Sequence, residues 1–152
     1  MQAFRVGDLR RPIFDGTGAL LNGGRWNSPG HAITYAAQTY AGALMEVLVH
    51  ANLRVMPKYH GVIVIDIPDK LSVEYISMET MTSWGTANLR PHRRFGDRWL
   101  AEQRSAILMV PSVVLQGREQ NVLINPTHPN FPLIQGSAPA PVFWDPRLFQ
   151  GR

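Results

Sequence analysis

The chain of 152 residues contains no cysteine. This absence excludes a disulfide framework, a cysteine nucleophile and a cysteine metal site, and it is compatible with a reducing cytosol. No stretch approaches the roughly 18 consecutive apolar residues that a membrane helix needs, and no apolar run follows the charges of the first residues. We therefore expect a soluble, unexported, cytoplasmic protein that does not enter a membrane.

Lysine is nearly absent as well. Only Lys58 and Lys70 interrupt a basic set that is otherwise arginine, and the formal net charge is +4. Arginine presents a planar fork that matches phosphates and carboxylates, so its dominance favours an anionic ligand, a nucleic acid or an acidic protein partner. The charge balance does not choose among these three.

The length and the 45% share of hydrophobic residues suffice for one packed core, so we expect a single compact domain over residues 1–152. Strand-like segments outnumber helical ones without β-α-β alternation, which predicts an α+β fold. The predicted helices cover residues 39–52 and 95–103, and the predicted strands cover 3–6, 31–37, 59–67, 106–115, 121–125 and 140–144. Residues 7–24 read as a loop, and 72–88 as a short strand with a loop.

The helix predicted at 39–52 carries the clearest candidate for chemistry. Thr39 suits its N-cap. Apolar residues recur at helical spacing and predict one buried stripe, formed by Tyr40, Leu44, Val47, Leu48 and Ala51. Glu46 lies roughly opposite this stripe and shares a face with His50, one turn later. The plain alternative is an exposed Glu–His pair that adds only a few tenths of a kcal/mol to the helix.

Three further polar residues occupy positions that suit a binding cleft. Arg25 follows Gly23 and Gly24, which permit a tight turn that can bring its guanidinium to an anion. Ser112 follows a proline inside a strand, at a bulge or edge where a side chain can face a cleft. Arg5, within the first strand, is either a surface charge or a phosphate contact.

Common catalytic signatures are missing. The sequence holds no Gly-x-Ser-x-Gly segment around Ser112, no His-Glu-x-x-His zinc helix and no phosphate-binding Gly-x-x-x-x-Gly-Lys loop. Its five histidines show no metal-ligand spacing, so we expect no metal.

Four separated motifs occur in the order that the RES-domain family shows. They are Gly-Gly-Arg-Trp-Asn at 23–27, Tyr35 with Ala43-x-x-Glu46-x-x-x-His50, Arg-Phe-Gly-Asp-x-Trp-Leu at 94–100, and the run from Ala106 to Ser112 followed by 119–129. The chain therefore resembles this family, named for its arginine, glutamate and serine, over nearly its whole length.

The resemblance implies a toxin of a bacterial toxin–antitoxin pair that consumes NAD. It also implies a fold similar to ADP-ribosyltransferases, with a mostly antiparallel split sheet and few helices. By position, Arg25, Glu46 and Ser112 match the naming residues, and Tyr35, His50 and, less directly, Asn125 accompany them. The implied partner is an antitoxin with a helix-turn-helix DNA-binding domain that blocks the toxin's cleft.

These residues suit cleavage of the bond between ribose and nicotinamide. The leaving pyridinium needs no proton, and a carboxylate such as Glu46 can stabilise the positive charge on the ribose. In this hypothesis Arg25 grips the pyrophosphate, Tyr35 and Ser112 orient nicotinamide and ribose, and His50 supports Glu46. Water, phosphate or a protein side chain could each capture the ribosyl cation, so hydrolysis, phosphorolysis and mono-ADP-ribosylation of a protein remain open.

A hypothesis of another class is a basic module that binds nucleic acid or cleaves RNA. Against it, Phe95 and Trp99 look like the buried side of a helix rather than stacking platforms, so we expect no direct nucleic-acid partner. The residues of this basic module would be Arg90, His92, Arg93, Arg94, Arg98 and Arg104.

The third hypothesis is a soluble α+β domain in which the polar face of the helix at 39–52 has only a structural role.

Overall fold

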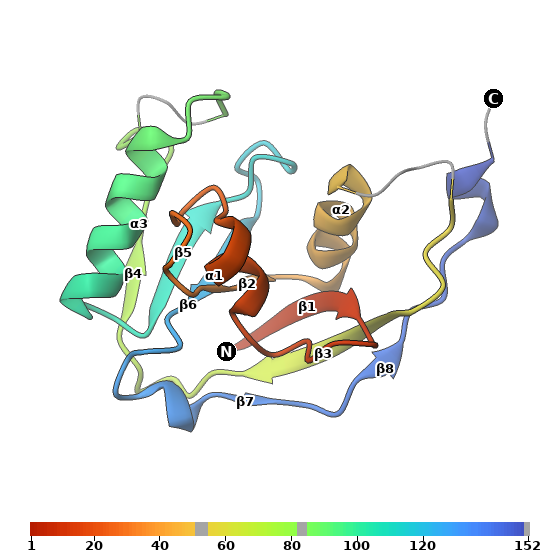
Figure 1. Cartoon of the computed structure of the whole chain (residues 1–152), viewed down its shortest axis with the longest axis horizontal. Helices are drawn as coiled ribbons and strands as arrows, with labels where there is room; N and C mark the ends of the chain where they lie inside the picture. The colour runs from red at the N-terminus through yellow and green to blue at the C-terminus, as the bar shows by residue number, and fades with distance from the viewer. Residues whose placement is uncertain (51–54, 82–84, 151–152) are drawn as a thin grey trace.

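The computed structural model describes residues 1–50, 55–81 and 85–150, which form one eight-stranded sheet with few helices (Figure 1). The strand order is β4-β5-β6-β2-β1-β3-β7, with β8 also paired to β3. Within these residues every pairing is antiparallel except that of β4 with β5, which confirms the α+β prediction. The strands are β1 (Gln2–Asp8), β2 (Thr34–Ala37), β3 (His60–Asp66), β4 (Val73–Tyr75), β5 (Ile107–Pro111), β6 (Gln120–Ile124), β7 (Gln135–Gly136) and β8 (Ala140–Pro141).

The sheet narrows to a single paired position in its middle. The half formed by β4, β5, β6 and β2 joins the half formed by β1, β3, β7 and β8 only where Phe4 pairs with Ala37. This division confirms the expected split sheet. The candidate site lies at this junction.

In the described residues three α-helices accompany the sheet: α1 (Thr17–Asn22), α2 (Tyr40–His50) and α3 (Arg90–Glu102). The described part also contains two short 3-10 helices near the C-terminus, η1 (Phe131–Leu133) and η2 (Pro146–Phe149). Figure 1 shows α3 beside the β4–β5 half, α2 above β1, and α1 between the two. Helix α1 lies in residues 7–24, which were predicted to be a loop, so that prediction is wrong here. The sequence shows no helical signal because the helix has only six residues and includes Gly18, a residue of low helix propensity. Helix α3 begins five residues before its predicted start, because Pro91 occupies the first turn, where proline is tolerated.

Helix α2 matches the prediction in extent but not in orientation. Gly42 N donates to Thr39 Oγ1 at 2.9 Å, so Thr39 caps the helix as expected. The described part ends at His50, and the predicted last residues, Ala51 and Asn52, lie outside the described residues.

The predicted buried stripe of α2 is wrong. The buried residues of this helix are Gly42 and Ala43, whereas Tyr40 is exposed and Leu44, Val47 and Leu48 are only half-buried. Small side chains let the helix approach the sheet closely. Because Glu46 follows Gly42 by about one turn, it lies on the side that faces the sheet.

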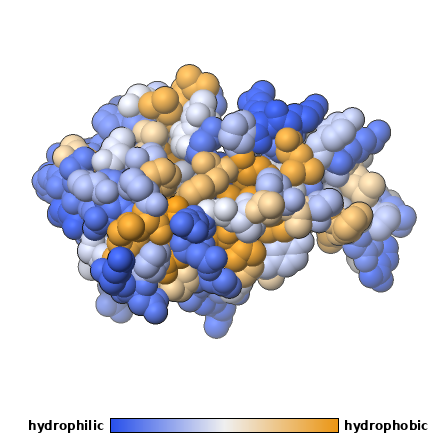
Figure 2. Space-filling view, turned by 90° about the horizontal axis from the view of Figure 1, so that it is seen from below, coloured by the Kyte–Doolittle hydropathy of each residue, from blue (hydrophilic) through white to orange (hydrophobic). Residues whose placement is uncertain are grey.

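In the described residues the hydrophobic core forms two clusters, one on each face of the sheet. Ile107 and Met109 of β5 belong to one cluster, and Leu108 and Val110 to the other, as strand alternation requires. The second cluster includes Trp99 of α3, which is fully buried. On the face seen in Figure 2, hydrophobic residues gather along the middle of the molecule, with hydrophilic residues at both ends. No helix in the described ranges has both the length and the apolar character to cross a bilayer.

Candidate active site

A cleft of about 800 Å³ opens at the junction of the two half-sheets. Helix α2 forms one side, the segment that follows α1 forms another, and β1 and β2 contribute the floor. Five of the predicted site residues line it, namely Arg5, Arg25, Tyr35, Glu46 and His50. Other lining residues include Phe4, Gly24, Ala37, His60, Pro111, Val114 and Asn121.

The carboxylate of Glu46 is held through one oxygen. Ser112 Oγ and Asn121 Nδ2 each donate to Glu46 Oε1 at 2.8 Å. Within the described chain, Glu46 Oε2 has no hydrogen-bond partner. The side chain is half-buried and lines the cleft, so the carboxylate is held in place at the cleft through Oε1 alone among the described contacts.

Ser112 reaches Glu46 from beneath the cleft. It directly follows Pro111, the last residue of β5, and is fully buried. Its Oγ accepts a hydrogen bond from Leu115 N at 3.2 Å, which leaves the hydroxyl hydrogen to point at Glu46. Ser112 is not among the residues that line the cleft, so its contact is with the carboxylate.

Arg25 sits in the Arg25 loop, defined here as residues 23–28. Gly23 has a φ of +68°, which favours glycine, and a Cβ on Gly24 would lie 2.5 Å from Tyr35 Oη. Arg25 Nη1 donates to Thr86 O at 3.3 Å. Arg25 forms no ion pair with a carboxylate in the described ranges, so its guanidinium can meet an anion in the cleft.

The hydroxyl of Tyr35 supports the Arg25 loop. It accepts a hydrogen bond from Trp26 N at 3.0 Å and donates one to Asn27 Oδ1 at 2.7 Å. Burial raises the pKa of Tyr35 above its ordinary value of 10.0, so the phenol stays neutral. The ring lines the cleft.

Two predicted residues lie at the cleft but have other contacts than expected. His50 Nδ1 lies 2.8 Å from the main-chain oxygen of Glu46, so Nδ1 is the donor and the ring does not bind the Glu46 carboxylate. Arg5 donates to Ile13 O at 2.6 Å and to Tyr35 O at 2.5 Å. Burial lowers the pKa of Arg5, and its guanidinium braces the main chain.

Asn125 is not brought to the cleft. It is fully buried, and its Oδ1 accepts hydrogen bonds from Thr127 N at 2.9 Å and Thr127 Oγ1 at 2.8 Å. This Asx-turn follows β6, and Asn125 is absent from the cleft lining. The side chain serves the turn.

Asn121 is the site residue that sequence reasoning missed. It lies in β6 opposite Ala37, and its side chain reaches Glu46. The sequence did contain a signal for Asn121: asparagine is depleted in strands, so an asparagine inside a predicted strand indicates a specific contact of its side chain. No group of three or more acidic, histidine or cysteine residues that could hold a metal ion occurs in residues 1–50, 55–81 and 85–150.

Comparison with known proteins gives a consistent family. The sequence model of the RES domain matches residues 2–145. The chain is 37% identical over 139 residues to the "Prs ADP-ribosylating toxin" of Sphingobium sp. (strain YBL2), covering 89% of this chain and 86% of that protein. It is 33% identical over 116 residues to "Toxin Res" of Pseudomonas putida KT2440, covering 75% and 78%.

A solved structure shares the fold. The similar chain comes from the M. tuberculosis MbcT–MbcA toxin–antitoxin complex, with a TM-score of 0.72. The alignment covers 97% of this chain and 86% of the other at 19% identity.

Proposed function

The chain belongs to the RES-domain family, and we propose that it is a toxin of a bacterial toxin–antitoxin pair that consumes NAD in the cytoplasm. The reaction is cleavage of the bond between nicotinamide and ribose. One observation carries the proposal: Glu46 lies in the cleft, its Oε1 is fixed by two neutral donors, and its Oε2 has no hydrogen-bond partner among the residues that the structure describes.

Glu46 stabilises the cation that forms as this bond breaks. The electron pair of the bond leaves with nicotinamide, which departs as a neutral base, and positive charge develops on the ribose. A carboxylate fixed in advance lowers the energy of that charge without reorganising during the reaction. Ser112 and Asn121 keep Glu46 in place, and neither carries a positive charge that would cancel it.

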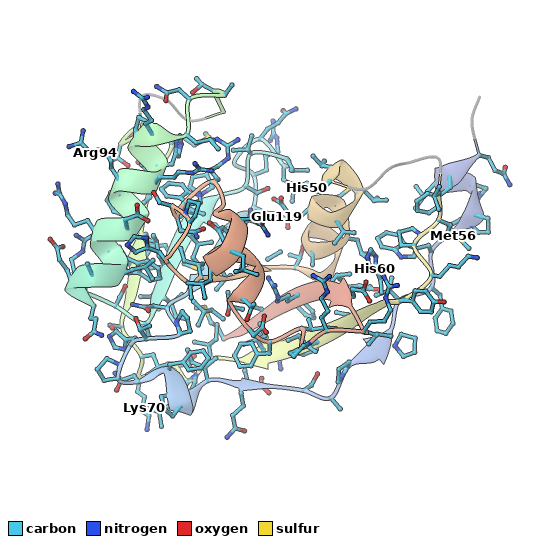
Figure 3. The ribbon with its side chains drawn as sticks, viewed as in Figure 1. His50, Met56, His60, Lys70, Arg94 and Glu119 are labelled. Atoms are coloured by element: carbon cyan, nitrogen blue, oxygen red, sulfur yellow. The ribbon has the colours of Figure 1, made fainter. Side chains whose placement is uncertain are left out.

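Arg25 holds the pyrophosphate of NAD. Its guanidinium faces the cleft without a carboxylate partner in the described residues, and the fork geometry suits two phosphate oxygens. The Tyr35 ring, also in the cleft lining, packs against a flat part of the substrate. His50 is the last described residue of α2 (Figure 3), and its Nε2, which has no hydrogen-bond partner among the described residues, binds a ribose hydroxyl in this proposal.

Water or inorganic phosphate captures the ribosyl cation in this proposal. The second candidate function is mono-ADP-ribosylation of a protein, favoured by the 37% identity to a relative named an ADP-ribosylating toxin. Both outcomes use the same cleft and the same carboxylate. They differ only in the nucleophile that reaches the sugar.

The proposed partner is an antitoxin with a helix-turn-helix domain that covers the cleft. The support is the similarity to a chain solved as part of a toxin–antitoxin complex. The exposed arginines of this chain suit an acidic surface on such a partner.

The test is to incubate purified protein with NAD, with and without inorganic phosphate and with and without cell lysate. Nicotinamide release is measured, and the ADP-ribose product is identified by mass. Release without lysate supports an NAD-degrading enzyme, and a phosphorylated product indicates phosphorolysis. Release only with lysate, with ADP-ribose on protein, supports the transferase. No release in any condition contradicts the proposal.

The variant Glu46→Gln isolates the charge of the carboxylate. Glutamine keeps an oxygen that accepts from Ser112 and Asn121, so the fold and melting temperature should stay close to those of the parent. Loss of the negative charge should lower kcat by about 10²-fold or more. Glu79→Gln, at an exposed glutamate remote from the cleft lining, is the matched control. Parent-level turnover by Glu46→Gln would remove Glu46 from the mechanism.

A further inference from the structure

The motif at residues 94–100 has so far received no role, yet it lies in α3 against the Arg25 loop. Asp97 Oδ1 accepts a hydrogen bond from Ser28 N at 2.9 Å, and Asp97 Oδ2 accepts one from Ser28 Oγ at 2.6 Å. Arg93 Nε donates to Gly24 O at 2.8 Å. The loop is therefore tied to α3 on both sides of Arg25.

We propose that Asp97 is a positioning residue that sets the place of Arg25 in the cleft by holding the main chain of its loop. This inference rests on the function proposed above, in which Arg25 grips the pyrophosphate. Asp97 itself is absent from the cleft lining and acts through the loop.

The guanidinium of Arg25 depends on its main chain for its position. Its own hydrogen bond, to Thr86 O, is long at 3.3 Å. By contrast, Arg104, two residues after the end of α3, forms ion pairs with Glu74 at 2.9 Å and Glu102 at 2.5 Å. An arginine that must receive a ligand cannot be clamped in that way, so the loop that carries it must be fixed instead.

The helix and the loop also fit without spare room. A Cβ on Gly96 would lie 1.7 Å from Trp26 O, so only glycine lets the loop lie this close. The Trp26 ring meets the buried ring of His92 edge-on, with centroids 4.9 Å apart. Asp97 adds to this packing its two hydrogen bonds from Ser28. Hydrogen bonds to a half-buried carboxylate are stronger than those between neutral groups.

The kinetic signature follows from the role of Arg25. An arginine that grips the pyrophosphate does so before and during bond cleavage, so a misplaced Arg25 weakens binding in both states. Asp97→Ala should raise KM for NAD by about tenfold and leave kcat within about threefold.

Asp97→Asn is the conservative variant that should restore function. Its amide oxygen accepts from Ser28 N, and its NH2 group donates to Ser28 Oγ, because a hydroxyl can exchange the donor role for the acceptor role. KM should return to within about threefold of the parent. Glu102→Ala, which removes an ion-paired carboxylate of α3 away from the loop, is the matched control.

A double-mutant cycle with Arg25→Ala separates positioning from general destabilisation. If Asp97 acts through Arg25, adding Asp97→Ala to Arg25→Ala should change KM by less than about twofold. An equal, roughly tenfold effect in both backgrounds would overturn the inference. So would a parent-like KM for Asp97→Ala.

Amide hydrogen exchange gives a readout that needs no turnover. Asp97→Ala should speed exchange at the amides of Trp26 and Ser28, whereas Asp97→Asn and Glu102→Ala should not. Unchanged protection in Asp97→Ala would overturn the inference even if the parent released no nicotinamide. If Asp97→Ala exchanges faster than the parent but the parent releases no nicotinamide, the role of Asp97 in holding the loop stands and the proposed function is contradicted.

Discussion

At the scale of single residues, the choice of neutral donors around Glu46 matters for the chemistry. A lysine or arginine in their place would fix the carboxylate equally well but would offset its charge. Ser112 and Asn121 fix one oxygen through neutral donors, which in the proposed reaction leaves the charge of the carboxylate to act on the substrate. Their energetic value lies in keeping the carboxylate oriented when the cation forms.

Removal of either donor should therefore slow the reaction without abolishing it. A hydrogen bond to a charged group contributes about 1.5–3 kcal/mol, so Ser112→Ala and Asn121→Ala should each lower kcat by about 10-fold to 100-fold. Because both bonds reach the same oxygen, the two losses should not combine additively. Steady-state kinetics on the two variants and the double variant measures this, with Ser137→Ala, remote from the cleft, as the control. Unchanged kcat in both single variants would contradict the role.

The sequence singled out Arg25, Glu46 and Ser112 as candidates because each stands in a distinctive motif. It could not identify their contacts. His50 was expected to support the carboxylate, but its ring folds back onto the main chain of its own helix. Asn121 lies inside β6 and reaches Glu46, whereas Asn125 lies just beyond the end of this strand and binds Thr127 in a turn. The sequence does not show where the strand ends, so it could not tell the two apart.

At the scale of elements, the places of the strands were predicted better than their ends: the strand predicted at 106–115 stops at Pro111, and that predicted at 140–144 stops at Pro141. Residues 59–67 gave a clear β-branched run, which became β3. For α2 the wrong face was predicted to be buried. Its large apolar residues predicted the buried side, but the side that packs against the sheet carries the small residues Gly42 and Ala43. Such a choice depends on how closely a helix can approach a particular sheet, which helical periodicity does not encode.

The packing of α3 against Trp26 should make the fold sensitive to acid. Burial lowers the pKa of His92 below its ordinary 6.5, the charge of Arg25 lowers it further, and a main-chain contact at Asn88 opposes this in part. The unfolded chain therefore binds this proton more tightly than the folded chain does. The stability contributed by neutral His92 is complete above about pH 6.5 and is lost as the pH falls from there toward its lower folded pKa.

Melting temperatures between pH 8 and pH 5 test this. His92→Phe keeps an aromatic ring beside Trp26 but takes up no proton, so its melting temperature should fall less over this range. Burial also lowers the pKa of His60, so part of the acid sensitivity should remain in the variant. Identical pH profiles for the parent and His92→Phe would contradict the prediction.

At the scale of the whole molecule, the narrow join between the half-sheets explains where the cleft lies. Strands β1 and β2 meet at one paired position, so the halves diverge and leave room above Phe4 and Ala37. Each half brings different groups: α2 carries Glu46 and His50, while the loop held by α3 carries Arg25. The order of strand-like and helical segments predicts the α+β class, but long-range strand pairing, which the sequence does not show, determines this junction.

The outer face of α3 tests the alternative function. Arg90, Arg94 and Arg98 are exposed at four-residue spacing, and Arg94 projects away from the cleft in Figure 3. The aromatic residues of this helix are unavailable for stacking on bases, because Trp99 is fully buried and the Phe95 ring lies under Arg104 at 5.2 Å. Arginines alone give the weak, non-specific attraction to phosphates that salt suppresses.

We therefore expect no retention of a single-stranded RNA by about 10 nM protein at physiological salt in a filter-binding titration, because non-specific dissociation constants of about 10⁻⁴–10⁻⁶ M are at least about a hundredfold higher than this protein concentration. Replacing Arg90, Arg94 and Arg98 together by alanine should leave NAD consumption unchanged, because none of them lines the cleft. Submicromolar retention that weakens steeply with salt and disappears in the triple variant would instead assign the face to nucleic acid. None of the three arginines on the outer face of α3 lines the cleft. RNA retention and NAD consumption, both measured on the triple variant, therefore test the two functions separately.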